Sequence, residues 1–170
     1  MKKVLLCLLL TLLGSKAHAW GILFEPIIGY DRGQEQGSQV QGTGLGLRLG
    51  LGFSSFFIAP DIGYHQVQQG ATNTVTYTDV GATFGGDLGN FRIWYGLITG
   101  STFTFPSGAN TVSETGAGQK IGIGAKLGSS LHLNLEVRTI NYTQSQTSGS
   151  ATTPISEIGT YGFVSMSWVL

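Results

Sequence analysis

Apolar and polar residues alternate along much of the chain, and the clearest example is the segment 43–53. Every second residue there carries an apolar side chain or a threonine methyl group: Thr43, Leu45, Leu47, Leu49, Leu51 and Phe53. The residues between them are all glycine except Arg48. Period-two alternation predicts a β-strand, because successive side chains point to opposite faces of a sheet. A face of glycines with one guanidinium fits a narrow polar interior, so we expect the apolar face to point outward, toward lipid.

The same alternation defines eight segments, at 21–30, 43–53, 56–66, 75–85, 91–104, 118–127, 131–142 and 156–170. Long polar connections are expected at 31–42, 67–74, 105–117 and 143–155, and short ones at 54–55, 86–90 and 128–130. Outer-membrane barrels combine an even strand number with long extracellular loops and short periplasmic turns, and their strands need about 9–11 residues to cross. The pattern predicts an all-β fold, an eight-stranded antiparallel up-and-down transmembrane β-barrel with both termini in the periplasm.

Charged residues within these segments fall on the parity opposite to the apolar stripe, which places them in the lumen. They are five acids and five bases: Glu25, Arg48, Asp61, Asp79, Arg92, Lys120, Lys126, Glu136, Arg138 and Glu157. The interior of an eight-stranded barrel is only just wide enough for its side chains, and most strand glycines share this parity and make room for the large ones. We therefore expect a polar lumen filled by side chains, in which these residues form a structural ion network.

Two groups stand out within this predicted network. A first connection centred near residue 36 or 37 would place Glu25 opposite Arg48, and a two-residue turn at 54–55 would place Arg48 opposite Asp61. Because arginine offers several donors in a fixed fork, Arg48 could bridge both carboxylates. The second group is Lys120, Lys126, Glu136 and Arg138, whose excess positive charge Glu157 or Asp79 would balance. Gating or a proton-linked role is the alternative, since ionisable groups at membrane depth are often functional.

Aromatic residues predicted on the outward face gather near the ends of the expected strands. Those near the short turns are Phe53, Phe56, Phe84, Phe91 and Trp168, and those near the long connections are Tyr30, Tyr64 and Phe103. Membrane barrels carry girdles of aromatic side chains at both interfaces. We expect these two groups to mark the edges of the lipid layer.

Candidate chemistry is sparse. His65 and His132 are both expected to point inward, and neither has a specific nucleophile and acid around it, although Ser165, Ser167 and Glu136 could approach His132. Two separated histidines also make a poor metal site. The Gly44–Gly46 region lies within a strand with no following helix, so it is no phosphate loop. The sequence thus predicts no catalytic residue, no metal and no cofactor, with lumenal hydrogen bonding for both histidines.

The first nineteen residues have the features of a secretory signal peptide. Lys2 and Lys3 precede an apolar run over 4–13, and Ala17-His18-Ala19 is a small-x-small cleavage site. Cleavage after Ala19 would leave residues 20–170 as one barrel domain. Without the three lysines of the leader, six basic residues remain against nine acidic ones, a net charge near −3, and no cysteine remains. This balance argues against a nucleic-acid partner, which would need a basic patch.

Two stretches of the mature chain carry a family resemblance. The segment Phe24-Glu25-Pro26-Ile27-Ile28-Gly29-Tyr30 looks like a first strand, and the tail Phe163-Val164-Ser165-Met166-Ser167-Trp168-Val169-Leu170 is similar to the signal read by the barrel assembly machinery. The chain resembles the small eight-stranded outer-membrane β-barrel proteins around the OmpA transmembrane domain, OmpX and the opacity-type proteins. It departs from them in ending with Leu170 instead of phenylalanine. The resemblance implies a Gram-negative-type outer membrane and assembly by that machinery, and it implies no catalytic residue.

These observations favour a non-enzymatic, monomeric barrel surrounded by outer-membrane lipid, with four polar extracellular loops in a structural or surface-recognition role and no ligand that the sequence can name. A narrow ion or small-solute pore is the first alternative, and it predicts conductance. A lipid-modifying barrel enzyme is the second, and it needs a Ser-His-acid set near the outer leaflet. A soluble lipocalin is the third, but it would need an apolar cavity and a polar exterior, the reverse of this distribution.

Overall fold

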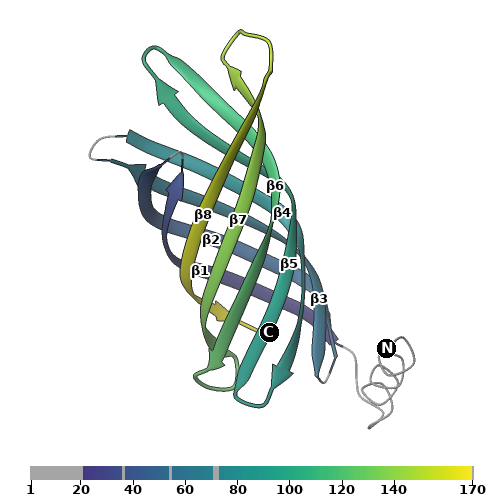
Figure 1. Cartoon of the computed structure of the whole chain (residues 1–170). Helices are drawn as coiled ribbons and strands as arrows, with labels where there is room; N and C mark the ends of the chain where they lie inside the picture. The colour runs from purple at the N-terminus through teal and green to yellow at the C-terminus, as the bar shows by residue number, and fades with distance from the viewer. Residues whose placement is uncertain (1–20, 36, 54, 71–72, 170) are drawn as a thin grey trace.

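The chain folds into one closed barrel of eight antiparallel strands, each paired with its neighbours in sequence, and β1 closes on β8. The computed structural model describes residues 21–35, 37–53, 55–70 and 73–169. The predicted signal peptide and Leu170 lie outside the described residues. The strands, shown in Figure 1, are β1 (Gly21–Glu35), β2 (Ser38–Gly52), β3 (Phe56–Gln69), β4 (Asn73–Leu88), β5 (Phe91–Ser107), β6 (Asn110–Lys126), β7 (Leu131–Thr147) and β8 (Thr153–Trp168). The predicted fold class is confirmed.

An apolar belt surrounds the half of the barrel that holds both described chain ends, which we call the termini end. Its side chains are exposed on the outer face, as shown by Ile22 at 71%, Ile62 at 53% and Leu135 at 51%. On β1 the belt runs from Ile22 to Tyr30, a stretch of nine residues. At a strand rise of about 3.3 Å and a tilt of about 45°, that stretch spans roughly 21 Å, close to the apolar band of membrane barrels. No helix long and apolar enough to cross a membrane is found among the described residues.

The opposite half, the distal end, consists of strand where long polar loops were expected, and that prediction is wrong. Residues 31–35, 38–42, 105–107 and 110–117 continue β1, β2, β5 and β6, and β7 and β8 extend likewise. Alternation continues there with valines inward, as at Val40, Val67 and Val75, and with glutamine or threonine outward. The outward residues stop being apolar where the belt ends. Strand boundaries predicted from alternating apolar residues therefore end there, although the strands continue.

Two irregularities reverse the inward and outward parity of β5. The register between β4 and β5 shifts at Val80/Gly81, and the register between β5 and β6 shifts between Ile98 and Ser101. Beyond this bulge Phe103 belongs to the lumenal cluster and is fully buried. The prediction of Phe103 as an interface aromatic is therefore wrong, because an extra residue in one strand moves every later side chain to the other face. The other predicted girdle residues described as exposed are Tyr30, Tyr64, Phe56, Phe84, Phe91 and Trp168.

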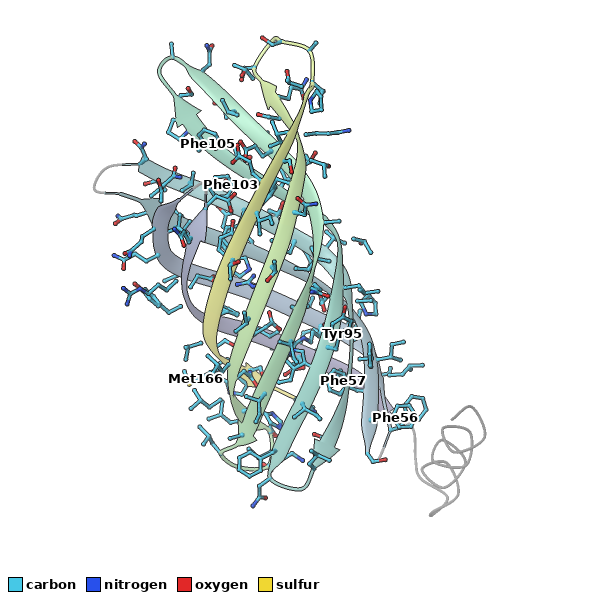
Figure 2. All side chains as sticks on the ribbon, viewed as in Figure 1. Phe56, Phe57, Tyr95, Phe103, Phe105 and Met166 are labelled. Carbon is cyan, nitrogen blue, oxygen red and sulfur yellow. The ribbon has the colours of Figure 1, made fainter. Side chains whose placement is uncertain are left out.

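Two apolar layers fill the lumen above and below its charged middle. Near the termini end, Leu23, Phe57, Ala59 and Trp94 form one buried cluster. In the distal half a larger cluster contains Val40, Val67, Val75, Tyr77, Ile98, Phe103, Ile140, Tyr142 and Tyr161, with Phe105 packed against it. Phe57 and Phe103 mark these two levels in Figure 2. The barrel is thus plugged by its own side chains at both levels.

The seam that closes the barrel is its shortest strand pair. β1 and β8 pair from Ile27–Ser167 to Gln34–Thr160, eight residue pairs, whereas every other adjacent pair shares at least eleven. Glycines let the two backbones approach here, since a Cβ on Gly29 would overlap the carbonyl of Val164. The distal stretch of β8 before Thr160 has no backbone pairing partner among the described residues of β1.

Candidate functional site

The charged residues between the two apolar layers form the candidate site. Glu25 is the register partner of Arg48, and Arg48 is the register partner of Asp61. The guanidinium of Arg48 nevertheless reaches across the lumen to Glu136, with Nη2 2.8 Å from Oε2, and it lies 3.5 Å from Glu25. Asp61 turns away from Arg48 and accepts from Lys120 Nζ at 2.8 Å and from the hydroxyl of Thr83. The predicted bridge from Arg48 to Asp61 is not formed. The lumen is narrow enough for the long side chain of Arg48 to reach Glu136 on β7, and Asp61 pairs with Lys120 on β6.

Glu25 is a buried acid on the side of the network toward the termini end. Arg92 Nη1 lies 3.3 Å from its Oε2, and the hydroxyl of Ser167 donates to its Oε1 at 2.6 Å. Arg92 also donates from Nε to Asp87 at 3.1 Å and stacks over the ring of Phe57 at 4.6 Å. Phe57 therefore connects the charged residues with the apolar cluster near the termini end, to which it belongs.

Arg138 is the centre of the network on its distal side. It donates to Asp79 at 3.0 Å, to the Tyr77 hydroxyl at 3.2 Å and to Asp31. Its Nη1 lies 2.8 Å from Nε2 of His65, whose Nδ1 contacts Asp31 and whose ring stacks on Tyr77 with centroids 4.4 Å apart. His65 is thus fixed on both ring nitrogens by an arginine and a carboxylate.

Tryptophan and glycine shape the middle of the lumen. Trp94 donates its indole N–H to Glu136 at 2.7 Å, and the guanidinium of Arg48 lies over its ring at 4.8 Å. A Cβ on Gly122 would overlap this indole, and a Cβ on Gly96 would lie 2.6 Å from Cε of Lys120. The space left among Arg48, Asp61 and their neighbours is about 30 Å³. That volume holds about one water molecule.

The structure brings together eight of the ten predicted lumenal charges. Glu25, Arg48, Asp61, Asp79, Arg92, Lys120, Glu136 and Arg138 are buried, and each has an ion pair. Lys126 is half-buried near the termini end, without an ion pair among the described residues. Glu157 is half-buried at the distal end, so it does not balance the second group, whereas Asp79 does through Arg138.

Sequence reasoning missed three buried acids, Asp31, Glu35 and Glu114. All three lie in segments for which the sequence predicts long polar connections. The signal that could have found them is parity, since Asp31 and Glu35 continue the inward set of Glu25 along β1. Glu35 and Glu114 lie near Glu157, and ligand oxygens of the three lie within 4.8 Å of one another.

Neither histidine belongs to a nucleophile–base pair in the described part of the chain. His65 is held by Asp31 and Arg138. His132 is 1% exposed, and neither of its ring nitrogens has a hydrogen-bond partner among the described residues, so the hydrogen bonding predicted for it is wrong. The nearby Ser167 donates to Glu25 instead. The arrangement fixes charges in place and offers no activated nucleophile among these residues.

Comparisons with known proteins agree on the fold. No protein-family model matches the sequence, and no curated protein matches it. Among solved structures, Neisserial surface protein A superposes with a TM-score of 0.59 at 9% identity, over 88% of this chain and 98% of that one. The attachment invasion locus protein Ail of Yersinia pestis, in complex with the heparin analogue sucrose octasulfate, gives 0.60 at 12% identity over 88% and 99%.

The outer-membrane protein OprG of Pseudomonas aeruginosa is a third similar structure. Its TM-score is 0.51 at 12% identity, over 88% of this chain and 96% of that one. All three are small eight-stranded outer-membrane β-barrels. The present chain has their fold, and the resemblance seen in its sequence is confirmed at the level of architecture.

Proposed function

We propose that this chain is a monomeric, non-enzymatic barrel of a Gram-negative-type outer membrane that presents its distal half at the cell surface for recognition. The observation that carries the proposal is the length of the strands. They contain 14 to 17 residues, whereas about 9–11 suffice to cross the membrane, and the excess lies beyond the apolar belt with polar residues outward. A structure that only had to cross the lipid would not need this projecting polar ribbon.

A closed lumen supports recognition over transport. The cavity among the charged residues has a volume of about 30 Å³, and apolar clusters containing Phe57 and Phe103 lie on its two sides. An ion would have to displace buried arginines from their carboxylates to pass. We therefore expect almost no conductance from the wild-type protein in planar bilayers, and a stable open level would favour the pore alternative.

The surface chemistry favours a neutral polar ligand over a polyanion. Ail was solved with a sulfated heparin analogue. In the described part of this chain, Arg32 is the one exposed lysine or arginine, and the distal mouth holds the half-buried Glu157 above the buried Glu35 and Glu114. Outward glutamine, threonine and serine offer hydrogen bonds without a net positive field, which suits uncharged glycans or polar protein surfaces.

The test shortens one projecting hairpin without touching the belt. Phe105 pairs with Val112 and Thr104 with Ser113, so residues 105–112 can be replaced by Asn-Gly, which favours a two-residue hairpin turn. Cells displaying the full chain are compared with cells displaying this variant on arrays of neutral glycans and extracellular matrix proteins. We expect binding by the full chain and its loss in the variant, at equal surface amounts. Binding that survives shortening of this hairpin and of the β7–β8 hairpin would overturn the proposal.

A separate experiment tests export, localisation and orientation in the membrane. We expect the precursor to be cleaved after Ala19 and the mature chain to fractionate with outer-membrane lipid, through the barrel assembly machinery. An epitope inserted at the β5–β6 tip, Gly108, should be reached by antibody on intact cells, whereas the same epitope at the β4–β5 turn, Gly89, should not. The opposite labelling pattern would reverse the proposed orientation.

A further inference from the structure

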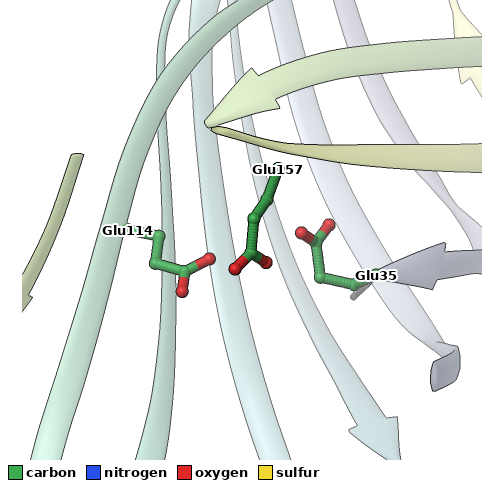
Figure 3. Close-up of side chains that lie close together, drawn as sticks. All are labelled: Glu35, Glu114 and Glu157. Carbon is green, nitrogen blue, oxygen red and sulfur yellow. The ribbon is translucent and has the colours of Figure 1, made fainter. Parts of the chain in front are cut away.

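Three glutamates from three different strands meet at the distal mouth of the barrel. Glu35 ends β1, Glu114 lies in β6 and Glu157 lies in β8. One carboxylate oxygen from each lies within 4.8 Å of the others, and in Figure 3 Glu114 and Glu35 point toward Glu157. Two oxygens on opposite sides of a calcium ion, each at about 2.4 Å from it, are about 4.8 Å apart, so the three oxygens are close enough to share one ion.

The orientation of Glu35 is an independent sign that a positive ligand belongs here. Its side chain is fully buried, the Tyr161 hydroxyl donates to one of its oxygens, and the other oxygen, Oε1, has no hydrogen-bond partner. A buried carboxylate oxygen without a donor costs free energy unless something fills the gap. Neither Glu35 nor Glu157 forms an ion pair with lysine or arginine within the described ranges, in contrast to the acids of the lumen.

The surroundings hold the Glu35 carboxylate in position. A Cβ on Gly159 of β8 would occupy the place of its Oε2, so this orientation requires the glycine. Tyr161, which donates to Glu35, contacts the hydroxyl of Tyr142 at 3.2 Å, and Tyr142 contacts Ser101 at 3.5 Å. Hydrogen bonds of this kind orient carboxylate ligands around a metal ion.

We propose that Glu35, Glu114 and Glu157 bind a divalent cation that prefers oxygen ligands, with calcium favoured. Three carboxylates supply up to six oxygens, and calcium accepts 6–8 in flexible geometry, whereas magnesium demands a near-ideal octahedron. The site lies beyond the end of the β1–β8 seam, since Gln34–Thr160 is the last pair. The ion would join β1, β6 and β8 where backbone pairing between β1 and β8 has stopped. This site does not depend on the proposed recognition role.

The test measures calcium binding by the refolded mature chain in detergent micelles. Isothermal titration with calcium chloride is expected to show one site with a dissociation constant of about 10⁻⁴–10⁻³ M, the range of extracellular calcium modules, and weaker binding of magnesium. Terbium provides a second readout, because Tyr161 and Tyr142 lie close enough to the cluster to sensitise its luminescence. Glu35→Gln and Glu157→Gln should each weaken binding at least tenfold.

Asp87→Asn is the matched control, because it removes one carboxylate at the opposite end of the barrel. It should leave calcium binding unchanged. The proposal is overturned if the wild type shows no saturable binding up to about 10 mM calcium, a concentration above the range of extracellular sites. It is also overturned if Glu35→Gln binds calcium as tightly as the wild type. Equal weakening by Asp87→Asn would show general charge attraction and also overturns it. Heat-modifiable migration in gels confirms that each variant is folded, and Glu157→Gln, at a half-buried position, is the less disruptive substitution.

Discussion

Replacing Lys120 by methionine should destabilise the barrel strongly. Lys120 Nζ lies 2.8 Å from Asp61 Oδ1, and the two residues are 7% and 8% exposed. At an effective dielectric constant of about 20, two unit charges at this separation attract by about 6 kcal/mol before desolvation is counted. Methionine keeps most of the side-chain volume but leaves Asp61 with the Thr83 hydroxyl as its hydrogen-bond donor. We expect a loss of about 3–5 kcal/mol in the free energy of unfolding, as for other buried pairs that lose one partner.

A double-mutant cycle separates this cost from simple loss of packing. Asp61→Asn alone leaves Lys120 without its carboxylate, and the double variant removes both charges. The double variant should be more stable than the sum of the single effects predicts, with a coupling free energy of about 2–3 kcal/mol. Lys126→Met is the control on the same strand, since Lys126 is half-buried and forms no ion pair among the described residues. Its cost should stay below about 1 kcal/mol.

Urea unfolding in lipid vesicles, followed by tryptophan fluorescence and checked for reversibility, measures the wild type and all four variants. The reasoning fails if Lys120→Met costs less than about 1 kcal/mol, or if the two single effects simply add. Either outcome would mean that water reaches the pair, in contradiction to a filled lumen.

Three further outcomes are expected. Gly122→Val should cost about 1–3 kcal/mol in the same assay because its Cβ would overlap the Trp94 indole, whereas Gly100→Val, with nothing within 4 Å, should cost little; equal costs would contradict the lumenal packing. Burial, with the neighbouring carboxylates of Glu114 and Glu157, raises the pKa of Glu35 from 4.5 to about 7. With a chelator present to remove divalent cations, Glu35 therefore loses its proton at a lower pH in the unfolded chain than in the folded one. The free energy of unfolding should fall by about 2 kcal/mol as the pH rises from 4.5 to 7. Glu35→Gln should not show this pH dependence. Brominated lipid should quench a probe at Leu135→Cys and not one at Asn134→Cys, and the reverse would invert the faces of β7.

Alternation alone predicts the architecture because, within the belt, the lipid-facing and lumen-facing sides of a strand require different residues. A charged side chain on the lipid face costs about 2–4 kcal/mol at mid-membrane, so Arg48 identifies the inward face of β2. Outside the belt both faces tolerate polar residues, and the outward stripe loses its signal. The distal parts of β1 and β6, with Glu35 and Glu114, were missed for this reason.

The partners within the lumen could be predicted only between neighbouring strands. Counting from the turns places Glu25 opposite Arg48, as the register shows. The contact between Arg48 and Glu136 joins residues 88 apart in sequence and depends on barrel diameter and strand stagger. The bulge near Gly100 likewise needs the structure, although a glycine in a strand often marks such a site.

The short β1–β8 seam also has a consequence for how the cylinder is made. Its two strands are the first and the last of the barrel, so the hairpins between them must remain an open, curved sheet until β8 pairs with β1. During that time the charged side chains that will line the lumen face water. If β1 and β8 paired one residue out of register, these side chains would face lipid. Only the correct final zipping step joins Arg138 on β7 to Asp31 on β1. Under mechanical load the same seam should part first, so a single molecule pulled by its C-terminus should release β8 before any other strand.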